Sequence, residues 1–351
     1  AVADMPAFRP TFILSVPRVW EKVYNGAEAK TGGGLKLRIF RWSVKVAITW
    51  SRALDEEGGP SAVLKAQHRL ADKLVLHKLR EALGGQAEYA ISGGAPLGER
   101  LGHFYRGVGL TVLEGYGLTE TTAPMNVGRP EKVKIGTVGP PMPGTSVRIA
   151  PDGEIQVKGI PVFRGYLNND EANAEAFTED GWFRTGDLGG MDEDGYLRIT
   201  GRKKEIIVTA GGKNVVPNTL EDPLRAHPLV SQCVVVGDQR PFVAVLITLD
   251  ADLLPKWLAN HGREPMTVEE AAQDDFVREH LQMAIDRANT QVSRAESIRR
   301  MHILTEDFTV DNGYLTPSMK VRRNQVLTDY AATVDKLYAD AQAERDAIAG
   351  R

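Results

Sequence analysis

The sequence has a single cysteine, Cys233, among its 351 residues. One cysteine excludes an internal disulfide framework and is typical of proteins from reducing compartments. Three valines, residues 234–236, follow it directly. We therefore expect a thiol buried in a strand and a cytoplasmic protein.

Long apolar runs, histidine pairs and an excess of one charge are also missing. No run of about 20 apolar residues occurs, and the N-terminal residues lack the pattern of a secretory signal. The seven histidines show no spacing typical of zinc sites. With 43 basic and 46 acidic side chains, the formal charge is -3. We expect a globular protein without a membrane span, a histidine-bound metal or a nucleic-acid partner.

The length predicts at least two hydrophobic cores. Helical patterns at residues 35–57 and 61–83 precede short strand patterns at 87–91 and 110–113, and each of these strands runs into a glycine-rich turn. This alternation favours α/β layers with ligand contacts at strand ends. Short strand-like pieces within residues 136–200, separated by Pro and Gly, indicate a small β-rich subdomain.

The remaining residues predict a second domain, of the α+β class. Strand patterns and helical patterns alternate there, the former at 205–209, 230–236 and 242–249 and the latter at 217–226, 275–292 and 323–348.

The first segment with chemical potential is Tyr116-Gly117-Leu118-Thr119-Glu120-Thr121-Thr122. An adenine ring could rest on the tyrosine, threonine hydroxyls could reach phosphate oxygens, and Glu120 could ligate Mg²⁺ through oxygen. So short a motif is also what a strand-to-helix turn with capping threonines looks like.

The second segment runs from Asp180 to Gly189 and is followed by Gly201-Arg202-Lys203-Lys204. Asp187 follows a Thr-Gly turn and has the short carboxylate needed to accept two ribose hydroxyls, while Arg202 could balance the remaining charge of a nucleotide. The alternative is a β-hairpin with an acidic turn.

Together these segments resemble the adenylate-forming superfamily of acyl-CoA synthetases, adenylation domains and luciferases. The resemblance covers nearly the whole chain and rests on the order and spacing of Ser92–Pro96, Tyr116–Glu120, Gly153–Glu154, Gly165–Tyr166, Trp182–Gly189, Gly201–Pro217 and Pro317–Lys320. It implies that residues 1–203 form the C-terminal part of the large AMP-binding domain, with α/β layers and a small β-rich subdomain. Residues 204–351 would form the small, mobile α+β C-terminal domain.

The resemblance also implies roles for single residues. Glu120 would hold Mg²⁺, and Thr119 would contact phosphate. The implied nucleotide-binding set is Gly94, Ala95, Tyr116, Gly117, Thr119, Asp187 and Arg202.

Four residues would carry the catalytic work, namely Lys320, Glu120, Thr119 and Lys204. Lys320 matches the family's mobile lysine, whose long cationic stem can neutralise charge at both reacting oxygens during adenylate formation. Its alternative is a solvated basic face shared with Arg322 and Arg323. Lys204 stands at the family's hinge position.

Gly211 and Gly212 match the loop that lines the pantetheine tunnel of coenzyme A, because glycine lets a thin arm pass close to the backbone. The alternative is a plain β-turn. The segment is not a Walker phosphate loop, since Asn214 stands where Ser or Thr is needed.

Residues 180–204, 9–11 and 16–22 look like the long-chain fatty acyl branch of the family. The resemblance therefore implies that a long-chain fatty acid, ATP and coenzyme A are substrates, that Mg²⁺ is required, and that acyl-AMP and then acyl-CoA form. The alternatives are a fatty acyl-AMP ligase that serves a carrier protein and a non-catalytic adenylate-binding fragment. No obligate protein partner is expected.

Residues 40–50 mix tryptophan, aliphatic and basic side chains, as helices at membrane surfaces do. The same apolar positions fit a face packed on a core, which is the favoured interpretation, with peripheral membrane contact as the alternative.

One element of the family's pattern is missing from residues 1–351, namely the Ser/Thr/Gly-rich loop ending in Pro-Lys-Gly that holds the β- and γ-phosphates. Removing even one transition-state donor costs about 10²–10³ in turnover. We expect this chain by itself to be weakly active or inactive, to expose apolar surface and to be poorly soluble.

Overall fold

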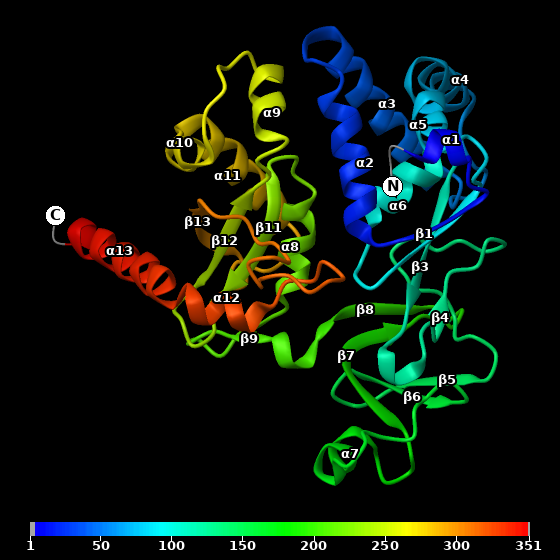
Figure 1. Cartoon of the computed structure of the whole chain (residues 1–351), viewed down its shortest axis with the longest axis vertical. Coiled ribbons are helices and arrows are strands. Elements are labelled where there is room, and N and C mark those ends of the chain that lie inside the picture. Colours follow the sequence, from blue (N-terminus) through cyan, green and yellow to red (C-terminus); the bar gives the residue numbers. More distant parts are fainter. Residues whose placement is uncertain (1–3, 350–351) are drawn as a thin grey trace. The chain divides into compact units, whose positions relative to one another are not determined.

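The computed structural model describes residues 4–349. Two compact units make up the fold (Figure 1). The first unit extends to Lys204 and includes Ala259–Gly262. The second unit comprises Glu205–Leu258 and the residues from Arg263 onward.

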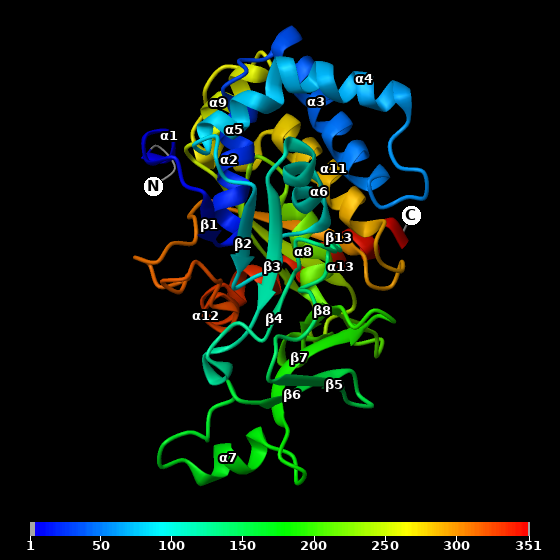
Figure 2. The ribbon, with the colours of Figure 1, turned by 90° about the vertical axis from the view of Figure 1, so that its right-hand side faces the viewer.

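A four-stranded sheet of order β1-β2-β3-β4 organises the N-terminal half of the first unit. Strands β1, β2 and β3 are parallel, and β4 runs antiparallel to β3. Figure 2 shows β2 and β3 side by side. The strands span Phe12–Ser15, Tyr89–Gly93, Thr111–Tyr116 and Asn126–Val127.

Helices supply most of the core beside this sheet. They span Met5–Phe8 (α1), Pro17–Ala29 (α2), Gly34–Ala53 (α3), Ala62–Ala71 (α4), His77–Ala82 (α5) and Glu99–Val108 (α6), and a π-helical turn at Asp72–Leu76 joins α4 to α5. Trp20 of α2 is fully buried and meets the ring of Tyr105 of α6 edge-on, with ring centroids 5.2 Å apart. Contacts of this kind stabilise helices by more than the buried area alone.

Helix α3 presents its apolar face to this core. Phe40, Val44 and Ala47 are buried, and Trp50 stacks on His68 of α4 with ring centroids 4.4 Å apart. The structure therefore shows the packed face that the sequence favoured. Peripheral membrane contact stays a prediction.

An antiparallel meander of four strands forms the rest of the first unit. Ile155, Val157, Phe183 and Leu197 fill its core. The strands span Thr145–Ile149 (β5), Glu154–Gly159 (β6), Phe183–Met191 (β7) and Leu197–Arg202 (β8), and the helix Asp170–Ala176 (α7) lies between β6 and β7 in sequence.

The second unit is built around a three-stranded sheet of order β11-β12-β13. All residues of β11 and β12 are buried, because hydrophobic clusters cover both faces of the sheet. The strands of this sheet span Val230–Val236 (β11), Val243–Leu249 (β12) and Ile298–Leu304 (β13). The second unit also contains a two-stranded sheet of Ile207–Val208 (β9) and Asn214–Val215 (β10). Its helices span Pro217–Arg225 (α8), Leu254–Asn260 (α9), Val268–Gln273 (α10), Asp275–Asn289 (α11), Arg323–Asp329 (α12) and Ala331–Ala349 (α13); the end of α9 belongs to the first unit.

Two expected elements differ from the structure, and one strand was not expected. The single helix expected at 323–348 is wrong, because the chain breaks at Tyr330, whose ring packs on those of Phe308 and Tyr314. The strand expected at 205–209 is reduced to the two residues of β9 after a 3₁₀ turn. Strand β13 was missed, because its exposed arginines interrupt the apolar pattern.

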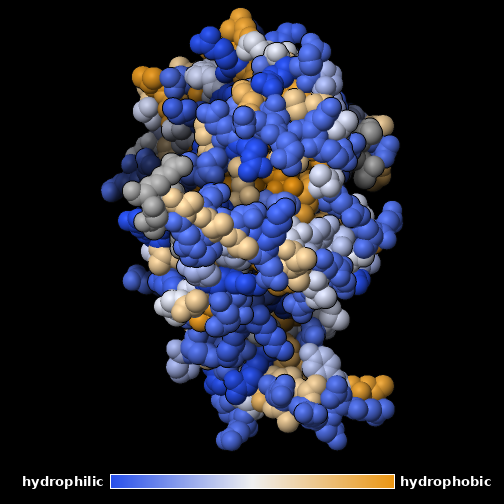
Figure 3. All heavy atoms as spheres, turned by 90° about the vertical axis from the view of Figure 1, so that its left-hand side faces the viewer, coloured by the Kyte–Doolittle hydropathy of each residue, from blue (hydrophilic) through white to orange (hydrophobic). Residues whose placement is uncertain are grey.

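Apolar side chains are exposed at several places. On β1, Phe12 is 52% and Leu14 is 72% exposed. Figure 3 shows one face of the molecule, which is mostly hydrophilic with apolar groups in separate small patches. In the part of the chain that the structure describes, no helix has the length and apolar character needed to span a bilayer. Poor solubility stays a prediction.

Helices α6 and α3 approach each other closely at Gly107. A Cβ atom placed there would lie 2.1 Å from the carbonyl oxygen of Ala47. We predict that Gly107→Ala destabilises the first unit by about 2 kcal/mol or more, because backbone must move apart to admit the methyl group. Thermal or urea unfolding measures the change.

Gly26→Ala in α2 is the matched control, because a Cβ atom there meets nothing within 4 Å. Relief of glycine's backbone entropy should stabilise that variant by about 0.5–1 kcal/mol. Equal stability of the two variants would contradict the close approach.

Candidate functional site

The segments that begin at Ser92 and Tyr116 lie side by side at the carboxyl ends of strands β2 and β3. Ser92 pairs with Glu114 and Gly93 with Gly115, so β2 and β3 end at the same level. The Glu114 carboxylate accepts the backbone N–H of Leu97 at 2.9 Å and ties the turn after β2 to β3. Carboxyl ends of neighbouring parallel strands are where such sheets bind ligands.

Glycine is required in both turns. Gly94 has a φ of 86°, in the region that favours glycine, and it is exposed together with Ala95. At Gly117 a Cβ atom would lie 2.8 Å from the Cα atom of Ala123. Glycine at 94 thus permits the positive φ of the first turn, and glycine at 117 permits the close approach of Ala123 in the second.

The segment after Gly117 makes a 3₁₀ turn, Thr119–Thr121. Thr119 is exposed, and the carboxylate of Glu120 accepts the hydroxyl of Tyr166 at 3.0 Å. The backbone N–H of Phe163 donates to the Glu120 carbonyl at 2.7 Å. Burial, and secondarily the bond to Glu120, raises the pKa of Tyr166, so its hydroxyl remains a donor at neutral pH. Glu120 is thus held at the surface.

The donor set for a metal here is small. Within residues 4–349 no three His, Cys, Asp or Glu side chains gather closely enough to hold an ion. One carboxylate nevertheless fits Mg²⁺, which is usually bound through one or two carboxylates together with substrate phosphates and water.

Tyr116 and Arg202 hold the carboxylate of Asp187 from two sides. The tyrosine hydroxyl donates to Oδ2 at 2.6 Å, and the arginine Nε donates to Oδ1 at 2.8 Å. Asp187 is 5% exposed. Burial and the neighbouring carboxylate raise the pKa of Tyr116, so it stays a protonated donor. Three residues that the sequence assigned to the nucleotide site therefore contact one another, while their roles stay predictions.

The hairpin with an acidic turn that was considered as the alternative is present in the structure. Strands β7 and β8 do form an antiparallel hairpin. Asp187 lies inside β7, however, and the connecting turn is at Asp192–Gly195, where Gly195 N–H donates to the Asp192 carbonyl.

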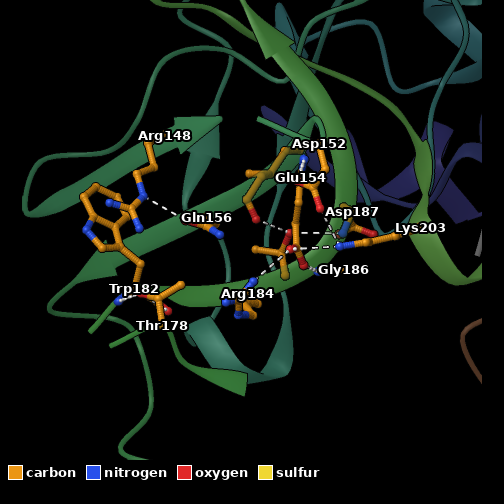
Figure 4. A network of polar contacts seen from close by, with 12 residues as sticks. Arg148, Asp152, Glu154, Gln156, Thr178, Trp182, Arg184, Gly186, Asp187 and Lys203 are labelled. Atoms are coloured by element: carbon orange, nitrogen blue, oxygen red, sulfur yellow. Dashed lines mark hydrogen bonds and ion pairs between the residues drawn. The ribbon is translucent and has the colours of Figure 1, made fainter. Parts of the chain in front are cut away.

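Glu154 and Lys203 extend this polar cluster and were not assigned roles from the sequence. Lys203 Nζ lies 2.6 Å from Asp152 Oδ2 and 3.5 Å from Glu154 Oε2. Figure 4 shows the network, with Glu154 between Lys203 and the turn at Gly186. The motif around Gly153 and Glu154 was the only sequence signal for it.

Lys320 lies in the second unit on a short turn closed by the bridge between Leu315 and Val321. The Thr316 hydroxyl accepts the backbone N–H of Lys320 at 3.1 Å, while the lysine itself is exposed. The backbone at Lys320 is thus held in place by hydrogen bonds, while its long side chain extends into solvent.

The alternative of a solvated basic face is wrong for Arg323. Only 14% of its side chain is exposed, and its guanidinium donates to Glu221 Oε1 at 2.6 Å and to the Val235 carbonyl at 3.0 Å. Glu221 is 2% exposed and also accepts the Val235 N–H at 2.7 Å. This buried pair anchors α12, directly after the Lys320 turn, to α8 and β11.

The Gly211–Gly212 segment has the geometry of the plain turn considered as its alternative. It connects β9 to β10; Gly212 N–H donates to the Thr209 carbonyl at 2.8 Å, and Gly212 has a φ of 74°. Both glycines are exposed, so the backbone is open to solvent.

Comparison with protein families finds two matches. Residues 1–167 match the model described as AMP-binding enzyme. Residues 204–342 match the AMP-binding enzyme C-terminal domain.

Among curated proteins, the chain is 53% identical over 335 residues to the long-chain-fatty-acid–CoA ligase FadD15 of Mycobacterium bovis, covering 95% of this chain and 56% of that protein. It is 34% identical to the human long-chain-fatty-acid–CoA ligase ACSBG1, covering 94% and 49%. The chain thus spans about half the length of the curated relatives it matches.

The fold is that of adenylation domains. The adenylation domain of a carboxylate reductase from Mycobacterium chelonae superimposes with a TM-score of 0.70 at 24% identity, over 96% of this chain and 48% of that one. The corresponding domain from Segniliparus rugosus, solved with AMP and a carboxylic acid, gives 0.67 at 23% identity, over 95% and 48%.

We predict that the buried pair of Glu221 and Arg323 contributes strongly to the stability of the second unit. Glu221→Ala leaves the buried Arg323 without a carboxylate partner, and removing one member of such a pair costs about 3–5 kcal/mol. Thermal unfolding should show a large loss for Glu221→Ala. The exposed Glu279→Ala on α11 is the control and should change little. A small loss at Glu221 would show that the pair does not stabilise this unit.

Proposed function

The chain belongs to the family of AMP-binding enzymes, and we propose that it acts in the ATP-dependent activation of a long-chain fatty acid to acyl-AMP and then to acyl-CoA. The observation that carries this proposal is the contact of Tyr116, Asp187 and Arg202 in the same unit as two glycine-rich turns at adjacent strand ends.

Asp187 is suited to a ribose. An ionised carboxylate offers about four lone-pair positions. Tyr116 and Arg202 occupy one position on each oxygen. Each oxygen therefore keeps acceptor capacity, and two adjacent ribose hydroxyls are donors at the right separation to use it.

The turn after Gly117 would face the phosphates. The hydroxyl of Thr119 is a donor, and Glu120 would contribute one carboxylate oxygen to Mg²⁺, which supplies charge neutralisation at the phosphates when bound. Gly94 and Ala95 would border the adenine and the acyl group beside Tyr116, and Gly117 would let the next turn pack closely on Ala123.

Lys320 would neutralise the charge that develops when the fatty carboxylate attacks the α-phosphate and pyrophosphate leaves. Lys204 is the last residue of the first unit, which supports its role as the hinge between adenylation and thioester formation. Gly211 and Gly212 would border the pantetheine arm of coenzyme A in the second step.

The substrate class follows the relatives named above, which are long-chain-fatty-acid–CoA ligases. A fatty acyl-AMP ligase that serves a carrier protein is the competing enzyme activity, and it differs in needing no coenzyme A. A cytoplasmic location, with peripheral membrane contact through α3, is also part of the proposal. Failure of the protein to co-sediment with anionic vesicles at low salt would exclude the membrane contact.

Nucleotide binding can be tested without turnover. Asp187→Asn replaces one acceptor oxygen by a donor that faces Tyr116 or Arg202, so we predict at least about tenfold weaker AMP binding by calorimetry. Glu193→Gln, at an exposed position of the same hairpin, should bind AMP like the unchanged protein. Equal affinity of the two variants would exclude Asp187 from the ribose site.

The two half-reactions can be separated. With palmitoyl-AMP and coenzyme A supplied, the thiol sulfur attacks the acyl carbonyl and AMP leaves, a step that needs no grip on β- and γ-phosphates. We predict palmitoyl-CoA formation above the uncatalysed rate, whereas palmitate with ATP gives little product, because residues 1–351 lack the phosphate loop.

Lys320→Ala should spare this thioester step, since the lysine is assigned to adenylation. It should abolish whatever palmitate-dependent exchange of pyrophosphate into ATP the chain shows, and Lys336→Ala is the control. Palmitoyl-CoA formation no faster than with heat-denatured protein would contradict the coenzyme A ligase activity.

A further inference from the structure

The register between strands β6 and β7 shifts next to Asp187. The ladder pairs Gln156 with Arg184 and Glu154 with Leu188. Ile155 alone on β6 therefore faces the three residues Thr185–Asp187 of β7. Such a bulge removes ladder partners from backbone groups and re-aims side chains.

Three polar groups of the bulge find partners nearby. The Thr185 hydroxyl donates to the Ile155 carbonyl at 2.7 Å and accepts the Asp187 N–H at 3.1 Å. The N–H of Gly186, at a φ of 71°, donates to Glu154 Oε1 at 3.1 Å. A carboxylate thus takes the place of the missing ladder acceptor at the centre of the bulge.

Glu154 is 4% exposed, and a carboxylate so buried requires compensation. Its second oxygen lies 3.5 Å from Lys203 Nζ and 3.7 Å from Arg184 Nη1. Both cations are about half exposed, so water can solvate them on their other side. The charge of Glu154 is therefore balanced from the solvent side, while its first oxygen reaches inward to the bulge.

Successive residues of the chain hold the two carboxylates. Arg202 donates to Asp187, and Lys203 donates to Glu154. Both carboxylates belong to one polar cluster, but only Glu154 contacts the backbone of the bulge. Deleting it would leave a partly buried N–H without its carboxylate acceptor at the residue before Asp187.

We propose that Glu154 is a positioning residue of the nucleotide site, whose carboxylate closes the bulge through the Gly186 N–H and so fixes Asp187 for the ribose. This inference rests on the proposed function for its ligand. The reach of the side chain matters more than its charge, because the bond to Gly186 needs only an acceptor oxygen at the right distance.

Two conservative variants separate reach from charge. Glu154→Gln keeps the length and an acceptor oxygen but loses the charge. Glu154→Asp keeps the charge but is one methylene too short. Amide hydrogen exchange at Gly186 in the ligand-free chain and calorimetric AMP binding are the two measurements.

We expect Glu154→Asp and Glu154→Ala to exchange at Gly186 at least about tenfold faster and to bind AMP at least about tenfold more weakly. Glu154→Gln should remain close to the unchanged protein in both. Asp180→Asn, which removes an ion pair with Arg148 on the same sheet, is the control and should alter neither.

The proposal is overturned if Glu154→Asp keeps full protection and affinity, or if Glu154→Gln loses both as Glu154→Ala does. Should Glu154→Ala fail to fold, the Asp and Gln variants decide. If the unchanged chain binds no AMP, the proposed function fails, and the exchange rates at Gly186 still decide whether Glu154 closes the bulge.

Discussion

The first unit depends on one carboxylate being held where two sheets meet. Tyr116 ends β3 of the parallel sheet, whereas Asp187 and Arg202 come from adjacent strands of the antiparallel meander. The short bonds to Asp187 connect these two sheets at the position where the candidate nucleotide site lies. A buried carboxylate is costly unless donors satisfy it, so the arrangement stabilises the unit only when both sheets are in place.

The second unit uses the same physical device for a different purpose. Glu221 is buried, accepts a backbone N–H of β11 and pairs with Arg323 at the start of α12. Lys320 stands a few residues before Arg323 and remains exposed. In each unit a satisfied, buried carboxylate gives rigid support to residues that stay available for a ligand. Rigid support of this kind is what positional and electrostatic catalysis require.

Site residues that lie inside motifs could be predicted from the sequence. The roles of the buried residues that hold them in place could not. The glycine-rich turns, Tyr116, Asp187 and Arg202 have recognisable neighbours, and the structure brings these three side chains together. Glu221 carries no such signal, and the motif at Gly153–Glu154 indicates no role for Glu154, because both carboxylates act on partners 14 and 32 residues away that only the fold brings close. The break at Tyr330 was equally hidden, since it depends on an aromatic contact with Phe308 rather than on a helix-breaking residue. Local pattern predicts elements, whereas tertiary packing decides their ends.

The bulge in β7 makes this strand sensitive to its length as well as to its composition. Side chains alternate between the faces of a strand, so a shift of one residue turns every following side chain to the opposite face. Three residues of β7 oppose one of β6, and the hairpin to β8 fixes the other side of the same strand. An insertion or deletion here could not be absorbed by sliding, because either neighbour would lose its register. The number of residues in β7 is therefore constrained as strongly as the identities of Thr185, Gly186 and Asp187, which fill the bulge.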